Sequence, residues 1–475
     1  MMNLIEADIC IIGAGSAGLS VASGAAQMGA RTVLIEVHKM GGDCLNTGCV
    51  PSKSLLAVAK SAHAVREASR HGIETVSPII RPEPVNAYVQ SVIGAIAPHD
   101  SVERFTGLGC TVIQAPAKFI DGKTVVAGEQ TIRARRFVIA TGSQPHIPPI
   151  PGLKEIDFLT NETIFQNIVL PTHLIIIGAG PIGCEMAQAH RRLGSRVTLL
   201  DIATMLPKDD PEAVAVVRRK LLAEGVELAE RVRDLRIERA ASGIAMIFTE
   251  GGTEHRIEGS HLLIATGRRP NLGGLDLERA GVRYSPNGIE VDSRLRTSNK
   301  RIFAAGDVVG GYQFTHMANY HAGIIIRNAL FRLPARNAPR AVPWVTYTDP
   351  EIAQVGPTEA EARRSLGSRI RILQADFSGN DRAQTEAATE GFLKVIVGSR
   401  GRIVGTTIVG SRAGELLTPW ILAISKGLKV GDIAGLIFPY PTLSEISKRA
   451  AGSYFTSVLF SSRTRAIVRF LGSFG

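Results

Sequence analysis

The apolar residues of this chain gather in short continuous runs, which alternate with longer stretches where small apolar and polar residues mix. The short runs predict buried strands, and the mixed stretches predict helices. In the first part of the chain, strands are predicted at residues 8–12, 31–35, 137–142, 174–177, 196–200 and 262–267. Helices are predicted after the first and the fourth strand, so two βαβ units are expected.

The last part of the chain mixes strand-like and helical runs without repeating this unit. The runs are predicted at residues 316–331, 392–397, 403–409, 414–425 and 443–458. Prolines cluster within 143–153 and again within 334–343, and such clusters interrupt regular structure. A chain of 475 residues is expected to hold about three domains, with boundaries near these clusters.

A glycine-rich turn follows the first predicted strand. Gly13, Gly15 and Gly18 stand where the strand gives way to a helix, and the second strand ends at Glu36. Glycines at this spacing let the backbone approach a pyrophosphate at the helix N-terminus, and the terminal acid binds ribose hydroxyls. The unit therefore predicts a dinucleotide site.

The same arrangement returns in the second unit. A glycine run from Gly178 to Gly183 follows the fourth strand, and the next strand ends at Asp201. Asp201 lies 23 positions after Gly178, and Glu36 lies 23 positions after Gly13. One glycine run is weak support for a dinucleotide site, but two complete copies with equal spacing predict two bound dinucleotides.

Two cysteines, Cys44 and Cys49, stand shortly after the first glycine run. Five positions of regular helix rise about 7.5 Å, which exceeds the roughly 7 Å limit on Cα separation for a disulfide. A disulfide therefore requires a departure from ideal helix, and Gly48 and Pro51 are expected to supply it. A dithiol beside a redox cofactor predicts an electron relay.

Composition and charge exclude several other classes of protein. The remaining cysteines, Cys10, Cys110 and Cys184, are too scattered for a disulfide scaffold, and Cys10 and Cys184 are expected to be buried and inert. No basic leader and no apolar stretch of about 18 residues is apparent, so a cytoplasmic location is expected. The net charge is +11, but the cations mostly alternate with acids and no nucleic-acid motif accompanies them, which argues against nucleic-acid binding.

With these motifs the chain resembles the class I pyridine nucleotide-disulfide oxidoreductases, the group that contains dihydrolipoamide dehydrogenase, glutathione reductase and mercuric reductase. The resemblance covers residues 4 to about 455. It is carried by the two glycine runs, the segment from Cys44 to Lys53, two Ala-Thr-Gly strand ends, the run Ala305-Gly306-Asp307, and the run Pro441-Thr442-Leu443-Ser444-Glu445.

The resemblance implies an α/β fold with two Rossmann-like dinucleotide-binding domains, for FAD and NAD, and a C-terminal α+β dimerisation domain. The first part of the FAD domain is expected at residues 1–148 and the NAD(H) domain at 149–270. The second, central part of the FAD domain is expected at 271–342, and the dimerisation domain with a basic tail at 343–475. The implied assembly is a homodimer.

The resemblance also implies catalytic roles. Cys49 would lie against the flavin, and Cys44 would be the outer thiol that meets the acceptor. Lys53 and Glu185 would form an ion pair beside the flavin. The alternative for Glu185 is a solvated acid that the helix dipole favours in a first turn.

The remaining implied residues bind the cofactors, and no metal ligands are predicted. Those expected around FAD are Gly13, Gly15, Ser16, Ala17, Gly18, Glu36, Gly42, Asp43, Cys44, Lys53, Ala117, Thr141, Gly142, Ser143, Gly306, Asp307, Gln313, Phe314, Thr315, His316 and Met317. Those expected around the nicotinamide dinucleotide are Gly178, Gly180, Ile182, Gly183, Asp201 and Gly267. No Lys or Arg directly follows Asp201 to meet a 2′-phosphate, so NADH is expected rather than NADPH.

One position departs from the dehydrogenase pattern. The family's acid/base histidine, which stands before a proline, is replaced here by Tyr440, followed by Pro441 and Glu445. The family's bond at this proline is cis, so a cis bond is expected here. A phenol with pKa about 10 shuttles protons poorly at neutral pH compared with imidazole, which argues against fast thiol exchange. The alternative for Tyr440 is packing at the subunit interface.

The same tyrosine resembles mercuric reductase, where it contacts a thiolate-bound metal. That enzyme also has a vicinal cysteine pair near its C-terminus and often an N-terminal metal-binding domain. This chain has no cysteine after Cys184, and no such domain is expected before residue 8. Efficient mercury reduction is therefore not expected.

The expected function is an FAD-dependent, NADH-linked oxidoreductase that passes electrons through Cys44 and Cys49 to a lipoyl or other dithiol-type acceptor. Two alternatives stay open, a reductase of mercuric or copper ions and a slow redox-sensing flavoprotein. At the C-terminus, Ile467, Phe470, Leu471 and Phe474 follow helical spacing with arginines beside them. This tail is expected either to pack against the dimer partner or to touch a membrane surface weakly.

Overall fold

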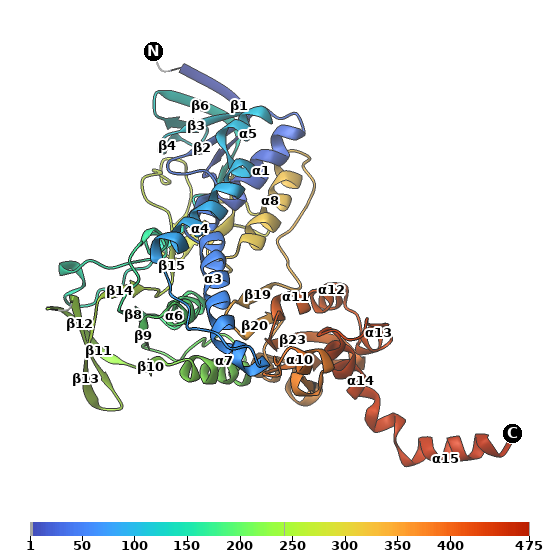
Figure 1. Cartoon of the computed structure of the whole chain (residues 1–475). Coiled ribbons are helices and arrows are strands. Elements are labelled where there is room, and N and C mark those ends of the chain that lie inside the picture. Colours follow the sequence, from blue (N-terminus) through green and yellow to red (C-terminus); the bar gives the residue numbers. More distant parts are fainter. Residues whose placement is uncertain (1–2, 242, 475) are drawn as a thin grey trace. The chain divides into compact units, whose positions relative to one another are not determined.

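Seven strands form the largest sheet, which is built around the first predicted strand (Figure 1). The order along the sheet is β3–β2–β1–β6–β5–β4, with β18 beside β6. The strands β1, β2, β3, β6 and β18 pair in parallel, whereas β4 and β5 pair antiparallel with each other and β5 pairs antiparallel with β6. The strand bounds are β1 Asn3–Ile12, β2 Thr32–Glu36, β3 Cys110–Gln114, β4 Ala117–Asp121, β5 Thr124–Ala127, β6 Gln130–Ile139 and β18 Ile302–Ala304.

The strand β1 explains why the sequence pattern was a continuous apolar run. Alternate residues point to opposite faces of a sheet, and both faces are covered here. Ile9 and Ile11 belong to one buried apolar cluster, with residues of α1 and α8, and Cys10 and Ile12 belong to another. The helices α1 and α8 contact each other, so the glycine-rich turn after β1 is held between sheet and helices.

A smaller sheet repeats the parallel arrangement around the second glycine run. Its order is β10–β9–β8–β14, and β8 pairs in parallel with both β9 and β14. The strand bounds are β8 His173–Ile177, β9 Arg196–Asp201, β10 Val226–Glu230 and β14 His261–Ile264. An antiparallel meander comes between β10 and β14 in the chain, with β11 Arg233–Ala240, β12 Gly243–Glu250 and β13 Thr253–Gly259.

The third main sheet is antiparallel throughout, with the order β19–β20–β23–β22–β21. Its strands are β19 Pro343–Thr346, β20 Glu351–Val355, β21 Arg371–Asp376, β22 Phe392–Val397 and β23 Ile403–Gly410. The helix α14 packs against β21 and β22, and α7 packs against β20 and β23. The fully buried Trp420 and Phe377 belong to the apolar core of this part.

The helices complete the structure, which describes residues 3–241 and 243–474. Their bounds are α1 Ser16–Gln27, α2 Gly42–Asn46, α3 Cys49–Glu67, α4 Pro82–Ile96, α5 Val102–Gly107, α6 Pro181–Leu193, α7 Pro211–Ala223, α8 Thr315–Ala329, α9 Glu359–Leu366, α10 Asp381–Thr385, α11 Ala413–Leu416, α12 Thr418–Lys426, α13 Val430–Ala434, α14 Glu445–Leu459 and α15 Ser462–Leu471. Three short strand pieces remain within the two dinucleotide-type parts, at β7 Ser143–Pro145, β15 Arg268–Pro270, and the pair β16 Tyr284–Ser285 with β17 Gly288–Ile289.

The chain divides into two units. One contains the residues up to Ile202 together with Glu227–Ala338, and the other contains Ala203–Val226 and the residues from Pro339 onward. The helix α7 therefore groups with the antiparallel C-terminal sheet, although its position in the sequence assigns it to the NAD(H) segment. The contact that holds it there is made by Lys394 of β22, which is 2% exposed and lies 3.0 Å from Asp210 at the start of α7.

Local structure differs from the sequence pattern in three places. The strands predicted at residues 137–142 and 262–267 end earlier, at Ile139 and Ile264, because the following glycines turn the chain. The helix predicted at 414–425 is divided into α11 and α12. Part of the proline-rich segment predicted as a linker forms β7, which pairs antiparallel with β15.

Candidate redox site and dinucleotide loops

The two glycine runs adopt the same backbone geometry. Gly13 and Gly178 have positive φ values of 105° and 110°, which favour glycine. A Cβ on Gly13 would lie 2.3 Å from the oxygen of Ala140, and one on Gly178 would lie 2.4 Å from the oxygen of Ala265. Each run thus packs directly against the end of the strand that closes its unit.

The acid at the end of the second strand also acts alike in both units. The N–H of Ala14 donates to Glu36 Oε2 at 2.5 Å, and the N–H of Ala179 donates to Asp201 Oδ2 at 2.6 Å. Each carboxylate therefore ties the end of its strand to its glycine turn. The sequence predicted these acids as ribose ligands, and this second contact was not visible from spacing alone.

The helix N-termini after these turns fit dinucleotide phosphates. Gly15 precedes α1 and Gly180 precedes α6, and no side chain caps either helix through a hydrogen bond. A Cβ on Gly180 would meet no atom within 4 Å, so the space in front of α6 is open. Unsatisfied N–H groups at a helix start attract anions, which suits the pyrophosphates of FAD and of NAD.

The dithiol lies where α2 ends and α3 begins. Cys44 is in α2 and Cys49 is the first residue of α3, and both are free thiols in this structure. The helix is broken at Thr47 and Gly48, as the disulfide geometry required. A Cβ on Gly48 would lie 2.8 Å from Asp43 Oδ2, so the chain folds back closely at this glycine.

The expectation that Pro51 helps break this helix is wrong. Pro51 is buried in the first turn of α3, where the helix continues without interruption to Glu67. In a first turn the missing N–H of proline would have no intrahelical partner in any case, so proline is tolerated there.

The two thiols are electrostatically different. Hydrogen bonding from Cys44 lowers the pKa of Cys49 to about 6, with help from the charge of Lys53 and the hydroxyl of Thr315, although burial opposes the shift. The same hydrogen bond raises the pKa of Cys44 well above its usual range, and burial adds to this. The reduced pair therefore favours a thiolate at Cys49 and a protonated thiol at Cys44.

Thr315 begins α8 and lies beside the inner thiol. Its Oγ1 is 3.8 Å from Cys49 Sγ. The segment before it contains a ring stack, in which Phe314 lies between Tyr312 and His316 with centroid distances of 5.9 Å and 5.1 Å. This segment was predicted to lie near the flavin ring, and the structure brings its Thr315 to the dithiol.

Lys53 and Glu185 form the ion pair that the resemblance implied. Lys53 Nζ of α3 lies 2.8 Å from Glu185 Oε2 of α6. Glu185 is only 4% exposed, so it is not the solvated first-turn acid of the alternative interpretation. The pair joins the segment that carries the dithiol to the helix that follows the second glycine run.

A polar network that the sequence did not predict surrounds Asp43. Its Oδ1 accepts from Asn161 Nδ2 at 2.9 Å and lies 3.2 Å from Arg268 Nη2. Arg268 also donates to Ser143 Oγ at 2.7 Å, and Ser143 donates to Asp307 Oδ2 at 2.6 Å. Asn161 and Arg268 carry no sequence signal of their own, because they are distant in the chain and belong to no motif.

Asp307 sits at the end of this network. Burial raises its pKa, although the Ser143 hydroxyl and the nearby Arg268 oppose the shift. A buried carboxyl group surrounded by hydroxyl donors suits binding of the polyol part of a cofactor such as the ribityl chain of FAD.

The other predicted cofactor residues lie on the same elements. Gly18 and Gly183 pack so closely that an added Cβ would lie 1.8 Å from the oxygens of Gly13 and Gly178. The rest are placed as follows: Ser16 and Ala17 in α1, Gly42 in α2, Ala117 in β4, Thr141 and Gly142 after β6, Ile182 in α6, Gly267 before β15, Gly306 after β18, Gln313 before α8, and Met317 in α8.

Tyr440 and Glu445 lie in the second unit, and the Tyr440-Pro441 bond is cis. The hydroxyl of Tyr440 donates to Asp381 Oδ2 at 2.9 Å, and this contact raises the pKa of the phenol, to which the charge of Glu445 adds. Asp381 was not predicted. Glu445 Oε2 instead accepts from the N–H of Thr442 at 3.5 Å.

The described residues contain neither a group of three or more His, Cys, Asp or Glu side chains that could hold a metal ion, nor a helix long and apolar enough to cross a membrane. The cysteines outside the dithiol, Cys10, Cys110 and Cys184, are all buried.

Comparison with known proteins gives a consistent result over nearly the whole chain. The family described as pyridine nucleotide-disulphide oxidoreductase matches residues 7–322, and its dimerisation domain matches residues 342–451. A mercuric reductase of Streptomyces lividans is 35% identical over 460 residues, covering 95% of this chain and 97% of the relative. A dihydrolipoyl dehydrogenase of Thermus scotoductus is 33% identical over 457 residues, covering 94% and 96%. The solved Cu(II) complex of the HOCl-induced flavoprotein disulfide reductase RclA from Escherichia coli has a TM-score of 0.83 at 28% identity, covering 93% of this chain and 98% of that one.

Proposed function

Because the chain belongs to the pyridine nucleotide-disulphide oxidoreductase family, we propose that it transfers an electron pair from NADH, through FAD and the Cys44–Cys49 pair, to a dithiol-type acceptor. Family members use FAD and a nicotinamide dinucleotide, and bound FAD would relay the electron pair between the nicotinamide and the cysteines. The observation that carries the proposal is the opposite polarity of the two thiols, with the pKa of Cys49 lowered and that of Cys44 raised.

The chain's own residues support each part of this role. The uncapped starts of α1 and α6 suit the cofactor phosphates, and Asp307 suits the ribityl hydroxyls. Lys53 and Thr315 favour the thiolate at Cys49. In the forward direction, NADH and one proton convert the disulfide to the dithiol and release NAD⁺. An acceptor disulfide is then cleaved by Cys44, and Cys49 attacks Cys44 to expel the second product thiol.

The dimerisation domain supports a homodimer as the working assembly. By the family resemblance, Tyr440 would act on Cys44 of the partner subunit. The hydrogen bond to Asp381 would keep its phenol protonated, so Tyr440 would donate a hydrogen bond or a proton there.

A second candidate acceptor is a soft metal ion. Tyr440 in place of histidine favours it, and so do the similarity to mercuric reductases and to the Cu(II) complex of RclA. Thiolates are the preferred protein ligands of such ions. The Cys44–Cys49 pair would then bind the ion and deliver electrons to it.

A stopped-flow acceptor panel tests the proposal. The holoenzyme is reduced anaerobically with NADH and mixed with lipoamide, glutathione disulfide, Hg²⁺, Cu²⁺ or oxygen, and Cys44→Ser serves as the control. Rapid reoxidation by a disulfide, lost in the control, supports the dithiol-type acceptor. Rapid reoxidation by a metal ion alone assigns the second candidate, and stoichiometric reduction without turnover on any acceptor would make the protein a redox sensor instead.

A further inference from the structure

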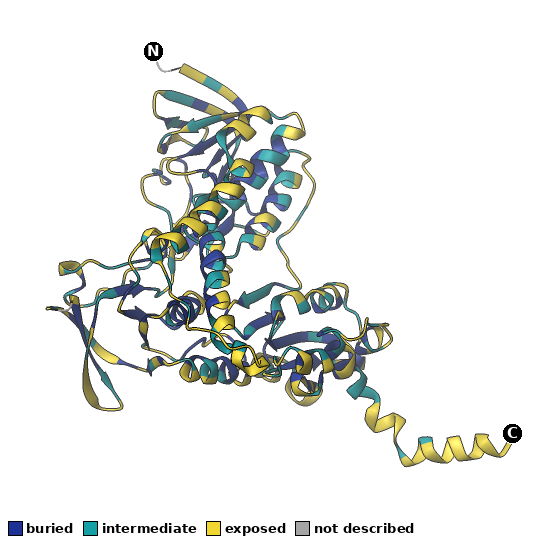
Figure 2. Cartoon of the chain, in the orientation of Figure 1, coloured by how far each residue is buried: buried dark blue, intermediate teal, exposed yellow. Residues whose placement is uncertain are grey.

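The last helix, α15, is amphipathic, and nothing in the proposed redox function requires it. It covers Ser462–Leu471, and none of its residues is buried (Figure 2). The matched dimerisation domain ends at residue 451, before this helix begins. The segment therefore has a physical character that the family match does not explain.

The apolar side chains of this segment form one stripe. At about 100° per residue, Ile467, Phe470 and Leu471 fall within an arc of about 100°. Their exposed fractions are 57%, 63% and 60%, and Phe474, which is 74% exposed, contacts Phe470 edge to face at 4.9 Å. Isolated exposed apolar residues are common, but a continuous stripe along one helix marks an interaction surface.

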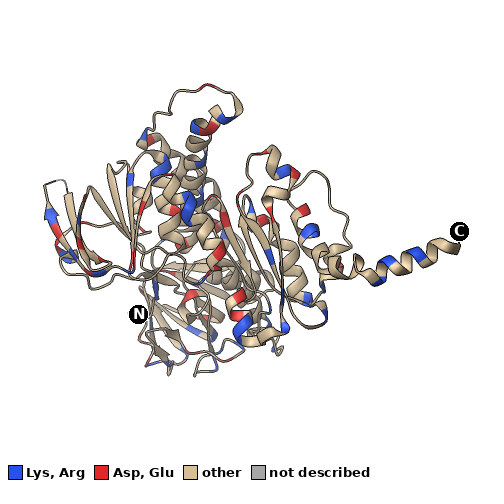
Figure 3. Ribbon diagram, turned by 90° about the horizontal axis from the view of Figure 1, so that it is seen from below, with Lys and Arg blue, Asp and Glu red and all other residues tan. Residues whose placement is uncertain are grey.

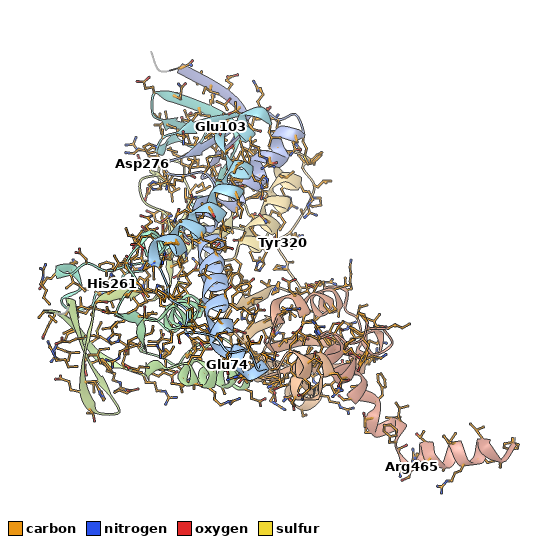
Figure 4. All side chains as sticks on the ribbon, in the orientation of Figure 1. Glu74, Glu103, His261, Asp276, Tyr320 and Arg465 are labelled. Carbon is orange, nitrogen blue, oxygen red and sulfur yellow. The ribbon has the colours of Figure 1, made fainter. Side chains whose placement is uncertain are left out.

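The opposite side of the helix is basic. Arg465 and Arg469 are one helical turn apart and lie across the helix from the apolar stripe. Figure 4 labels Arg465, and Figure 3 shows the Lys and Arg positions of the helix without any acidic residue beside them. From residue 446 to the end, the sequence contains five Lys or Arg residues and no Asp or Glu.

We propose that α15 docks this protein on the surface of an anionic lipid bilayer, with the stripe from Ile467 to Phe474 in the interface and the arginines at the lipid headgroups. A helix of ten residues is about 15 Å long, half the thickness of a bilayer core of about 30 Å, so it lies on the membrane and does not cross it. An apolar face together with a basic face supplies the two signals that stable surface binding needs.

Charge decides against a second copy of this chain as the partner of the helix. A two-fold contact between two such helices would bring like charges together, because the terminal segment has cations only. An anionic bilayer instead supplies both what the apolar stripe and what the arginines require. The dimerisation domain would also present two such helices per assembly, which strengthens attachment to one surface.

Vesicle sedimentation with the full-length holoenzyme tests this proposal. The protein is mixed with vesicles of phosphatidylcholine alone and with vesicles of phosphatidylcholine and phosphatidylglycerol. We expect binding to the anionic vesicles, little binding to the neutral ones, and release at about 1 M salt, where the Debye length falls to about 3 Å.

Two variants separate the contributions of the faces. The pair Ile467→Ser and Phe470→Ser should abolish binding, and the pair Arg465→Gln and Arg469→Gln should weaken it about thirtyfold on anionic vesicles. The matched control is Ile79→Ser, an exposed apolar residue outside the helix, and all variants should retain NADH-driven turnover.

The proposal is overturned if the wild-type protein does not sediment with anionic vesicles, or if the apolar pair variant sediments like the control. Light scattering supplies the remaining outcome. A variant that dissociates the dimer, in a protein that ignores both vesicle types, would assign the stripe to a second copy of the chain.

Discussion

The hydroxyl of Thr315 offers a direct test of how the inner thiol is activated. It lies 3.8 Å from Cys49 Sγ and is one of the groups that lower the pKa of this thiol to about 6. Thr315→Val removes the hydroxyl but keeps the shape of the side chain. Because the thiolate loses a hydrogen bond, the pKa of Cys49 should rise.

The size of the change follows from the length of the contact. Hydrogen bonds to charged groups contribute roughly 1.5–3 kcal/mol, and a long contact to sulfur is taken at about 1 kcal/mol. Since one pKa unit corresponds to about 1.4 kcal/mol, the pKa of Cys49 should rise by ~0.7. At pH 7 the thiolate fraction would then fall from about nine-tenths to about two-thirds.

The thiolate can be measured through the long-wavelength absorption band expected for the two-electron-reduced holoenzyme, followed as a function of pH under anaerobic conditions. Thr315→Ser restores a hydroxyl and is the matched control, so its titration should stay close to that of the wild type. If the titration of Thr315→Val coincides with the wild type, the hydroxyl does not stabilise the thiolate and this account of the polarity is incorrect.

Four other substitutions test separate parts of the structure. Cys49→Ser should abolish the long-wavelength band, whereas Cys44→Ser should show it without reductant; unchanged spectra in both would refute the relay. Asp201→Ala should narrow a preference for NADH, because its carboxylate repels a 2′-phosphate, and kcat/KM values for NADPH at or above those for NADH in the wild type would contradict this. Tyr440→His should increase dihydrolipoamide turnover by restoring a base that titrates near neutral pH, and no increase would count against a proton-transfer limit. Lys394→Met should lower the free energy of unfolding by about 3–5 kcal/mol in denaturant titrations, since it leaves buried carboxylates without their cation; a change below about 1 kcal/mol would show that the pairing is not stabilising.

Much of the first unit was predictable because its constraints are local. A glycine that must adopt a positive φ, or must let two backbones touch, leaves a mark at a fixed spacing in the sequence. The same spacing appeared twice, so the equivalence of Gly13 with Gly178 and of Glu36 with Asp201 could be seen before any coordinates. The buried parallel strands were predictable for a similar reason, because apolar cover on both faces removes the polar alternation.

The polar partners could not be predicted in this way. Arg268 reaches Asp43 and Ser143 across more than a hundred positions of the chain, and Asp381 reaches Tyr440 across 59. Long charged side chains occur all over a soluble protein, so composition and periodicity do not single these out. The Lys394 contact with Asp210 is similar, since burial of a cation becomes visible only when the sheet and helix are packed together.

The two candidate acceptors differ in what they require of Cys44. A disulfide acceptor must be attacked by a thiolate, yet the hydrogen bond to Cys49 and burial raise the pKa of Cys44 and keep it protonated. The residue that replaces the family's imidazole is a phenol whose own pKa is raised by Asp381, so at neutral pH it donates a proton and does not accept one. A soft metal ion removes this requirement, because binding to sulfur displaces the thiol proton directly. Disulfide exchange is thus limited by a proton transfer at Cys44 that metal reduction does not need, although both acceptors use the same relay behind it.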